Sequence, residues 1–276
     1  MTTRVNTPLR RLSIGVATGA LMLVAVPATP ADLQPRTIAA FDRYVRLTEA
    51  RMSADARFLW VDTLPEPQQR TRRSELRTGM LLIERLTTRD GRNEIPIPDG
   101  LVHHWVGAVF VPGATVDQAL ALLQDYDRHA DVYRPLVAQS RLLAREGDVF
   151  RVYLRFVTRK VITVVVNGEH EARFTRDRPD RAESRIYSTR IAQVEEAGTP
   201  SEREMPVGRD GGYLWRLHTY WRFLESDGGT YVQCESISLT RNIPVGFGWL
   251  VRPFVTSIPR ESLEFTLATT RKTLAR

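Results

Sequence analysis

The five histidines are the residues whose spacing can be tested most directly against known chemistry. His103 and His104 are adjacent, so on a strand their side chains point to opposite faces and cannot serve one metal ion. His129, His170 and His218 stand in other segments, at none of the spacings that recurrent metal sites use. The sequence therefore predicts no metal and no other cofactor.

Motifs for covalent catalysis and nucleotide binding are absent from the sequence. It contains no G-x-S-x-G elbow, no H-E-x-x-H pair, no phosphate-binding loop and no dinucleotide glycine fingerprint. The single cysteine, Cys234, lies within a predicted strand and is interpreted as a small buried hydrophobe rather than a catalytic thiol. The sequence therefore assigns no catalytic residue.

Glu235 is the ionisable residue in the most unusual position. It shares a predicted strand face with Tyr231, Ile237 and Leu239, so if that face is buried the carboxylate needs a partner. Glu235 and an arginine could recognise a ligand head group; we favour the alternative, in which they form a structural salt bridge or all of them face outward. The candidate partners, all in mid-strand, are Arg151, Arg155, Arg190 and Arg216.

The elements that position these residues are clearest in residues 211–276. Residues 212–223 alternate between large apolar and polar side chains, a period of two that predicts a half-buried antiparallel strand. A turn at residues 225–229 and a returning strand at 230–241 follow. Prolines and glycines at 244–253 predict a loop, and Pro259 predicts the start of a closing helix. One face of the first strand holds Tyr213, Trp215, Leu217, Trp221 and Phe223.

The middle of the chain predicts a strand, two short helices and four more strands. A strand over residues 103–111 ends at a Pro-Gly pair, and Thr115 is suited to cap the helix that follows. A second short helix is expected over residues 127–133. Strands are then expected over residues 137–145, 149–157, 161–174 and 182–194, before the two strands and helix at the end of the chain.

The first 31 residues have the layout of a secretory signal peptide. Arg4, Arg10 and Arg11 precede an uncharged apolar run at residues 12–26, and small residues follow. We expect cleavage after Ala31 and export to the periplasm or outside the cell; an uncleaved membrane anchor is the alternative. Removing this segment lowers the net charge from +7 to +4, and the basic residues form no stripe, so nucleic-acid binding is not expected.

Residues 32–100 read as an N-terminal extension that packs on the main domain. An amphipathic helix is expected over residues 37–53, and residues 58–73 read as a linker. Residues 76–86 are ambiguous between strand and helix, and residues 90–99 read as a loop. Residues 101–276 are expected to form the main domain and to fold without the extension.

The order of these elements resembles the START-like superfamily, also called the helix-grip or SRPBCC fold. The resemblance covers about residues 101–276 and rests on the element order, on GATVDQALALLQDYDRHADVYRPLVAQSRLL (residues 113–143) and on PRESLEFTL opening the last helix. The superfamily includes lipid-transfer START domains, polyketide cyclases and plant carriers of hydrophobic ligands. The resemblance implies an α+β fold, in which a curved antiparallel sheet of about seven strands wraps a long C-terminal helix around a cavity.

The aromatic strand faces agree with such a cavity, because they carry more large apolar groups than one helix must cover. A core filled by these side chains would give the same period of two. Residues 246–251, between prolines, are expected to gate the cavity or to touch a membrane transiently; alternatively, Trp249 and Phe254 plug the end of the core. The predicted ligand-binding residues are Phe150, Val152, Leu154, Phe156, Trp215, Leu217, Trp221, Glu235, Ile237, Trp249 and Phe254.

Three functions are compatible with this sequence. The favoured one is an exported protein that holds a lipid or another hydrophobic small molecule between sheet and helix. The second is an enzyme of the polyketide cyclase or aromatase kind, which would need polar groups converging in the cavity. The third is a cell-envelope scaffold protein with a filled core. Fold alone does not choose among them, and the sequence does not predict an oligomeric state.

Overall fold

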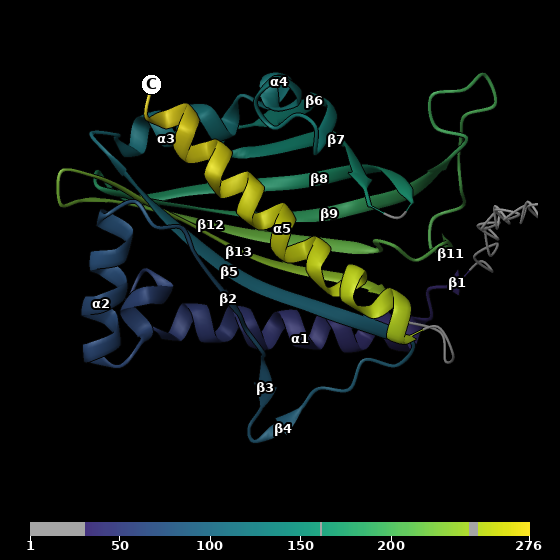
Figure 1. The fold of residues 1–276 in the computed structure, drawn as a ribbon, viewed down its shortest axis with the longest axis horizontal. Helices are drawn as coiled ribbons and strands as arrows, with labels where there is room; N and C mark the ends of the chain where they lie inside the picture. The colour runs from purple at the N-terminus through teal and green to yellow at the C-terminus, as the bar shows by residue number, and fades with distance from the viewer. Residues whose placement is uncertain (1–30, 161, 243–247) are drawn as a thin grey trace, which may run out of the picture.

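The computed structural model describes residues 31–160, 162–242 and 248–276, and for residues 248–256 it describes the backbone only. A nine-stranded antiparallel sheet dominates the fold, with the strand order β2-β5-β13-β12-β9-β8-β7-β6 and with β10 paired to β9 (Figure 1). Its strands are β2 (Leu82–Arg85), β5 (Gly100–Pro112), β6 (Val137–Glu146), β7 (Val149–Arg159), β8 (Thr163–Arg178), β9 (Arg181–Glu195), β10 (Arg203–Glu204), β12 (Arg216–Ser226) and β13 (Gly229–Arg241).

Five α-helices and several short elements complete the described chain. Two-residue strands pair β1 with β11 and β3 with β4, and 3₁₀ turns precede α2 and α4. These elements are α1 (Pro35–Ala54), α2 (Glu66–Arg77), α3 (Val116–Gln124), α4 (His129–Val132), α5 (Gly248–Leu274), β1 (Ala31–Asp32), β3 (Arg89–Asp90), β4 (Asn93–Glu94), β11 (Arg209–Asp210) and the 3₁₀ turns Trp60–Thr63 and Tyr126–Arg128.

Helices cover both faces of the sheet, which we call the inner and the outer face. The inner face is the one that α5 and α3 cover: Leu263 and Leu267 of α5 belong to one apolar cluster with Val232 and Cys234 of β13. The outer face is the one that α1 and α2 cover, and Ile237 of β13 packs there with α1. Because successive side chains of a strand alternate, strands such as β12 and β13 contribute to both clusters.

The C-terminal helix crosses the inner face diagonally and ends beside α3 (Figure 1). A side chain at Gly107 of β5 would place its Cβ 2.5 Å from Cδ1 of Leu267, so this glycine lets α5 approach the sheet closely. On the far side of the helix, Lys160 after β7 forms an ion pair with Glu261. Contacts from both sides explain how one helix is held by a sheet that wraps it.

The expected helix-grip order is confirmed. Strand β5, helices α3 and α4, six long strands and α5 follow one another as the sequence predicts. Thr115 caps α3 in a capping box, in which its side chain accepts from the N–H of Gln118 while Gln118 accepts from the N–H of Thr115. The sheet has nine strands rather than about seven, because the extension adds β2 at one edge and β10 pairs with β9.

The extension packs on the main domain, but one of its segments was predicted wrongly and an ambiguous one is resolved. Residues 58–73 are not a linker: they contain the 3₁₀ turn Trp60–Thr63 and most of α2, and Leu59, Trp60 and Val61 are buried against the outer face. Residues 76–86 resolve into the end of α2 and strand β2. The many Pro, Gln and Arg residues of this segment led to the linker prediction, although its few apolar side chains form a buried turn.

Two further boundaries differ from the sequence prediction. Helix α5 begins at Gly248 and includes Pro253 and Pro259, although a proline inside a helix removes one N–H bond and crowds the preceding turn. Strand β12 begins at Arg216, and the N–H of Trp215 donates to the carbonyl oxygen of Leu239, the residue already paired with Arg216. Two residues opposite one interrupt the alternation, as in a β-bulge, so Trp215 does not share a face with Leu217 and Trp221.

Candidate functional site

The inner face is closely packed at the end that α3 covers. Phe150 of β7 is fully buried, with its ring centroid 5.2 Å from that of Phe174 and 5.8 Å from that of Tyr126. Trp221 and Phe223 of β12 lie 6.1 Å apart with nearly parallel rings. At this end the aromatic side chains form a filled core, as one of the two sequence interpretations required.

Farther along the same face the apolar side chains are covered less completely. Leu154 and Phe156 of β7, Leu217 of β12 and Trp105 of β5 are each only partly buried, and so is Ile186 of β9. Strand pairing puts these five on the inner face, because residues that pair across neighbouring strands point to the same side of the sheet. A large apolar surface that its own chain covers incompletely is the first property expected of a binding face.

A row of polar residues crosses this apolar face. His103 of β5 pairs with Ser238 of β13, and Ser238 pairs with Leu217 of β12. The N–H of Leu217 donates to Oγ of Ser188 in β9 over 3.0 Å, and Ser188 pairs with His170 of β8. The two histidines therefore lie in one register row, separated by three strands. Burial lowers the pKa of His103 and of His170 to about 4, so both imidazoles are neutral at pH 7.

The two histidines of the row differ in their hydrogen bonds. Nε2 of His103 lies 3.0 Å from Oγ1 of Thr240. Nε2 of His170 is buried and has no hydrogen-bond partner, and the hydroxyl groups of Tyr126 and Ser184 on the same face are also buried and unpaired. Buried polar atoms normally have partners, so these three atoms mark where a bound molecule could supply one.

The structure separates the predicted ligand-binding residues into three groups. On the inner face lie Phe150, Val152, Leu154, Phe156, Leu217 and Trp221. On the outer face, in contact with the extension, lie Trp215, Glu235 and Ile237, which therefore do not share a surface with the first group. Trp249 and Phe254 belong to α5, but their side chains lie outside the described residues.

Glu235 is buried at the centre of a polar network on the outer face. Its Oε1 accepts from Nη2 of Arg51 over 2.5 Å and lies 2.7 Å from Nε2 of His104. Nδ1 of His104 lies 3.0 Å from the hydroxyl of Tyr44, which also accepts from the N–H of Thr88. Burial opposes the charge of Glu235, but the contacts to His104 and Arg51 outweigh burial and lower the pKa of its carboxyl group.

The predicted arginine partners of Glu235 were wrong. Arg51 comes from α1, and it was overlooked because the extension was not expected to reach this strand face. The four arginines proposed from sequence contact other groups: Arg151 contacts Glu146, Arg155 contacts Glu202, Arg190 contacts Glu204 and Arg216 donates to the carbonyl of Trp215. The network therefore holds α1 on the sheet and is the structural salt bridge that we favoured.

A second network attaches the same helix nearby. Oε1 of Glu49 in α1 accepts from the hydroxyl of Tyr187 over 2.5 Å and from that of Tyr220 over 2.9 Å. Burial and the neighbouring carboxylate raise the pKa of Tyr187 to about 12. Glu49 and Glu235 thus bind α1 to β9, β12 and β13 through ionic and tyrosine contacts, and we assign these contacts to docking of the extension.

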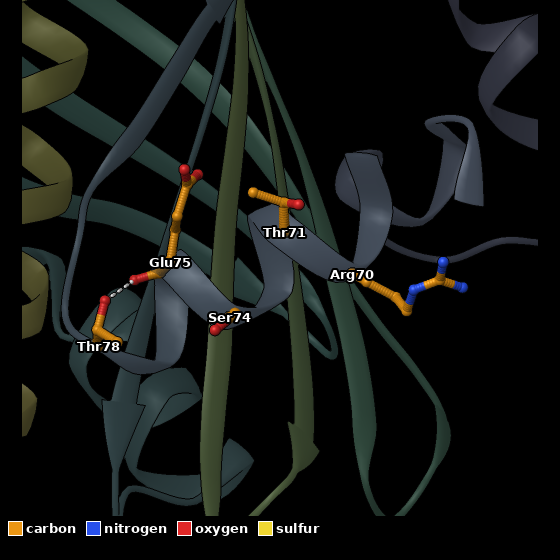
Figure 2. Close-up of a pocket in the computed structure, with 5 residues that line it drawn as sticks. All are labelled: Arg70, Thr71, Ser74, Glu75 and Thr78. Atoms are coloured by element: carbon orange, nitrogen blue, oxygen red, sulfur yellow. Dashed lines mark hydrogen bonds between the residues drawn. The ribbon is translucent and has the colours of Figure 1, made fainter. Parts of the chain in front are cut away.

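A surface hollow of about 410 Å³ lies on α2 (Figure 2). Its lining side chains are polar and mostly exposed, and Arg70 pairs there with Glu66 on the same helix. The hollow lies away from the polar row of the inner face. It is lined by Arg70, Thr71, Ser74, Glu75 and Thr78. Nothing in this set forms a buried binding site.

His170 is the site residue that sequence reasoning placed but did not assign. It was considered only as a metal ligand, and no group of three or more metal-ligating side chains occurs in the described part of the chain. The available signal was Gly168, because a glycine inside a strand marks a close approach.

Among the described helices, none is long and apolar enough to cross a membrane.

Comparisons with known proteins found similar solved structures, all at low identity. A STAR-related lipid transfer protein from Xanthomonas axonopodis is 17% identical, with a TM-score of 0.44 over 66% of this chain and 96% of that one. The Zhui aromatase/cyclase from Streptomyces sp. R1128 is 14% identical, with a TM-score of 0.44 over 64% and 95%. A START superfamily protein from Mycobacterium smegmatis is 11% identical, with a TM-score of 0.40 over 62% and 96%.

No protein-family profile matches the chain, and no curated protein matches it in sequence. The structural similarities are distant, so the residues of this chain alone define the candidate site.

Proposed function

We propose that the protein is exported and holds a hydrophobic small molecule or a lipid between the inner face of the sheet and α5. The observation that carries the proposal is the half of the inner face beyond Trp221. There, aromatic and aliphatic side chains such as Phe156 and Leu217 are only partly buried, although a long helix lies against the same face. Each buried methylene of a ligand would contribute about 0.8 kcal/mol, so apolar contact alone gives useful affinity.

The other functions considered from sequence have less support. A cyclase needs an acid and a base near the substrate, whereas the buried polar residues of the described inner face are hydroxyls and neutral histidines. A scaffold protein would fill the whole inner face, as the aromatic residues near α3 do. Membrane contact through residues 246–251 was predicted from sequence, but this segment lies outside the residues whose side chains the structure describes.

The binding proposal is tested by native mass spectrometry of the full chain, purified without detergent from an exporting host. We expect a co-purifying apolar molecule that is released on unfolding, and saturable uptake of the uncharged dye Nile red by the emptied protein. The control variant is Arg70→Ala, which alters only the hollow on α2. Protein that carries no apolar molecule and takes up no Nile red would favour the filled-core scaffold.

Export is tested separately by sequencing the N-terminus of the protein recovered from the host envelope. The charged start and apolar run of residues 4–26 support cleavage near Ala31. A mature chain that begins near Asp32 would agree with export, whereas an intact Met1 in the membrane fraction would indicate an anchor.

A further inference from the structure

His170 is enclosed on the inner face by its strand neighbours. It pairs with Val152 of β7 on one side and with Ser188 of β9 on the other. Its side chain is 2% exposed, and the ring of Phe156 stands edge-on to it at 5.9 Å. The imidazole is therefore a polar group set among the apolar residues of the proposed binding face.

The chain leaves room for this imidazole without giving it a partner. A side chain at Gly168 would place its Cβ 2.5 Å from Nε2 of His170, so the imidazole takes the space that a side chain at this position would fill. Nε2 nevertheless has no hydrogen-bond partner. A buried nitrogen left unpaired is costly, and the cost is removed when another molecule provides the missing hydrogen bond.

The described part of the inner face contains no buried ionic side chain. The carboxylates buried in the described chain are Glu235, on the outer face, and Asp210, which accepts from Nε1 of Trp215 and the N–H of Gly212. The buried polar residues of the inner face are neutral hydroxyls and histidines. A charged ligand group buried there would lack a counter-ion, which is strongly unfavourable.

The geometry points to an uncharged, largely apolar ligand whose hydroxyl or carbonyl group hydrogen-bonds to Nε2 of His170. This inference rests on the proposed function and adds the chemical class of the ligand and the residue that selects it. Because either nitrogen of a neutral imidazole can carry the proton, a hydroxyl group satisfies Nε2 in both tautomers, and a carbonyl satisfies it when Nε2 is protonated.

The test uses the full chain, Nile red as the reporter, and three competitors of one size: naphthalene, 2-naphthol and 2-naphthoate. We expect 2-naphthol to displace the dye at lower concentration than 2-naphthoate. In His170→Leu the ratio of the affinities for 2-naphthol and naphthalene should fall about tenfold, which corresponds to about 1.4 kcal/mol. Comparing ratios cancels the different solubilities of the two competitors.

A matched control is His218→Leu. In His218 the buried atom Nδ1 also has no partner, and burial lowers the pKa of this histidine to about 4. His218, however, lies on the outer face beside Phe41 and Tyr187. This variant should keep the affinity ratio of the wild type. His170→Phe, which retains a ring, provides a second test if the leucine variant folds poorly.

The outcomes separate the inference from the proposed function. If the wild type takes up no Nile red, the binding function itself fails, and the ligand class fails with it. If the dye binds but the naphthol-to-naphthalene ratio is unchanged in both His170 variants, or if 2-naphthoate binds as tightly as 2-naphthol, only the inference is overturned.

Discussion

The inner and outer faces of the sheet are built from the same strands but solve burial in different ways. Cys234 and Glu235 are neighbours on β13, yet Cys234 lies in an uncharged apolar cluster under α5, whereas Glu235 is bound to His104 and Arg51 under α1. On the outer face Glu235 is paired with Arg51 and Glu49 with Tyr187, although Nδ1 of His218 has no partner. The inner face leaves His170, Ser184 and Tyr126 with unpaired atoms. A face joined to its helix by ionic and tyrosine contacts suits permanent docking, and an uncharged face with unpaired atoms suits exchange with a ligand.

The largest expected effect comes from removing the cover of the outer face. Deleting residues 32–64 takes away α1 and exposes Trp215, Tyr220, Ile237 and Leu239. We expect insoluble protein without a cooperative melting transition, because a sheet must bury its apolar face. The measurement is solubility and thermal melting by circular dichroism, with a chain lacking only residues 1–31 as the control.

This expectation opposes the sequence-based one, in which residues 101–276 fold without the extension. A soluble fragment that starts at Pro65 and melts cooperatively would show that α1 is a dispensable addition. The comparison of two covered faces would then reduce to a single essential cover, α5.

The second prediction concerns the ionic network of the outer face. Glu235→Gln keeps the shape of the side chain but removes the charge that His104 and Arg51 contact. We expect the free energy of unfolding to fall by about 3–5 kcal/mol, the usual cost of breaking a buried ion pair from one side. Because Arg51 is 44% exposed and can turn to water, the lower value is expected.

Urea unfolding of Glu235→Gln beside Cys234→Ala measures the contrast between the two faces. Cys234→Ala removes one sulfur from an apolar cluster and should cost about 1–2 kcal/mol. Equal losses in the two variants would mean that the charge of Glu235 contributes nothing beyond packing.

The third prediction concerns how the stability of the protein depends on pH. Burial lowers the pKa of His103, His129, His170 and His218 to about 4, below the value near ~6.5 of an unfolded histidine. From pH 6.5 down to about 4 the unfolded chain binds protons that the folded chain does not. The free energy of unfolding therefore decreases as the pH decreases. Each such histidine contributes up to about 1.4 kcal/mol per pH unit.

Glu235 acts in a lower window. The pKa of Glu235 is lower in the folded protein than in the unfolded chain. Its contribution to the free energy of unfolding is therefore present above the unfolded pKa of about 4.3 and is lost as the pH falls through the folded pKa. Urea unfolding at pH 7, 6 and 5 should therefore give a smaller decline for His170→Leu than for the wild type, and an unchanged decline for Glu235→Gln. Parallel declines in wild type and His170→Leu would show that His170 is not buried as a neutral group.

The last prediction tests how closely α5 packs on the inner face. In Gly107→Ala the new Cβ would meet the side chain of Leu267 at 2.5 Å and the carbonyl oxygen of Leu82 at 3.1 Å. We expect a loss of about 1–3 kcal/mol from overpacking. The measurement is thermal unfolding, and unchanged stability would place α5 farther from β5 than the structure shows.

Much of the architecture was predictable because it depends on local signals. Alternating side chains located the six long strands that follow α4, and the Thr115 capping box located α3. The same signals also placed His103 and His104 on opposite faces, as the structure confirms. Local propensity failed at the turn at Trp60, where tertiary packing prevailed, and it also missed the helical residues before Pro259.

The sequence by itself determined the long strands, their succession along the chain and most of the residues that share a strand face. Only the tertiary structure decided which face is which, because a period of two looks the same under α1 and under α5. It also decided partners that lie far apart in the chain: Arg51 reaches Glu235 across 184 positions, and a bulge at Trp215 moves that side chain to the other face. Finally, His170 is defined by the hydrogen bond it lacks, which depends on everything packed around it and on no local pattern.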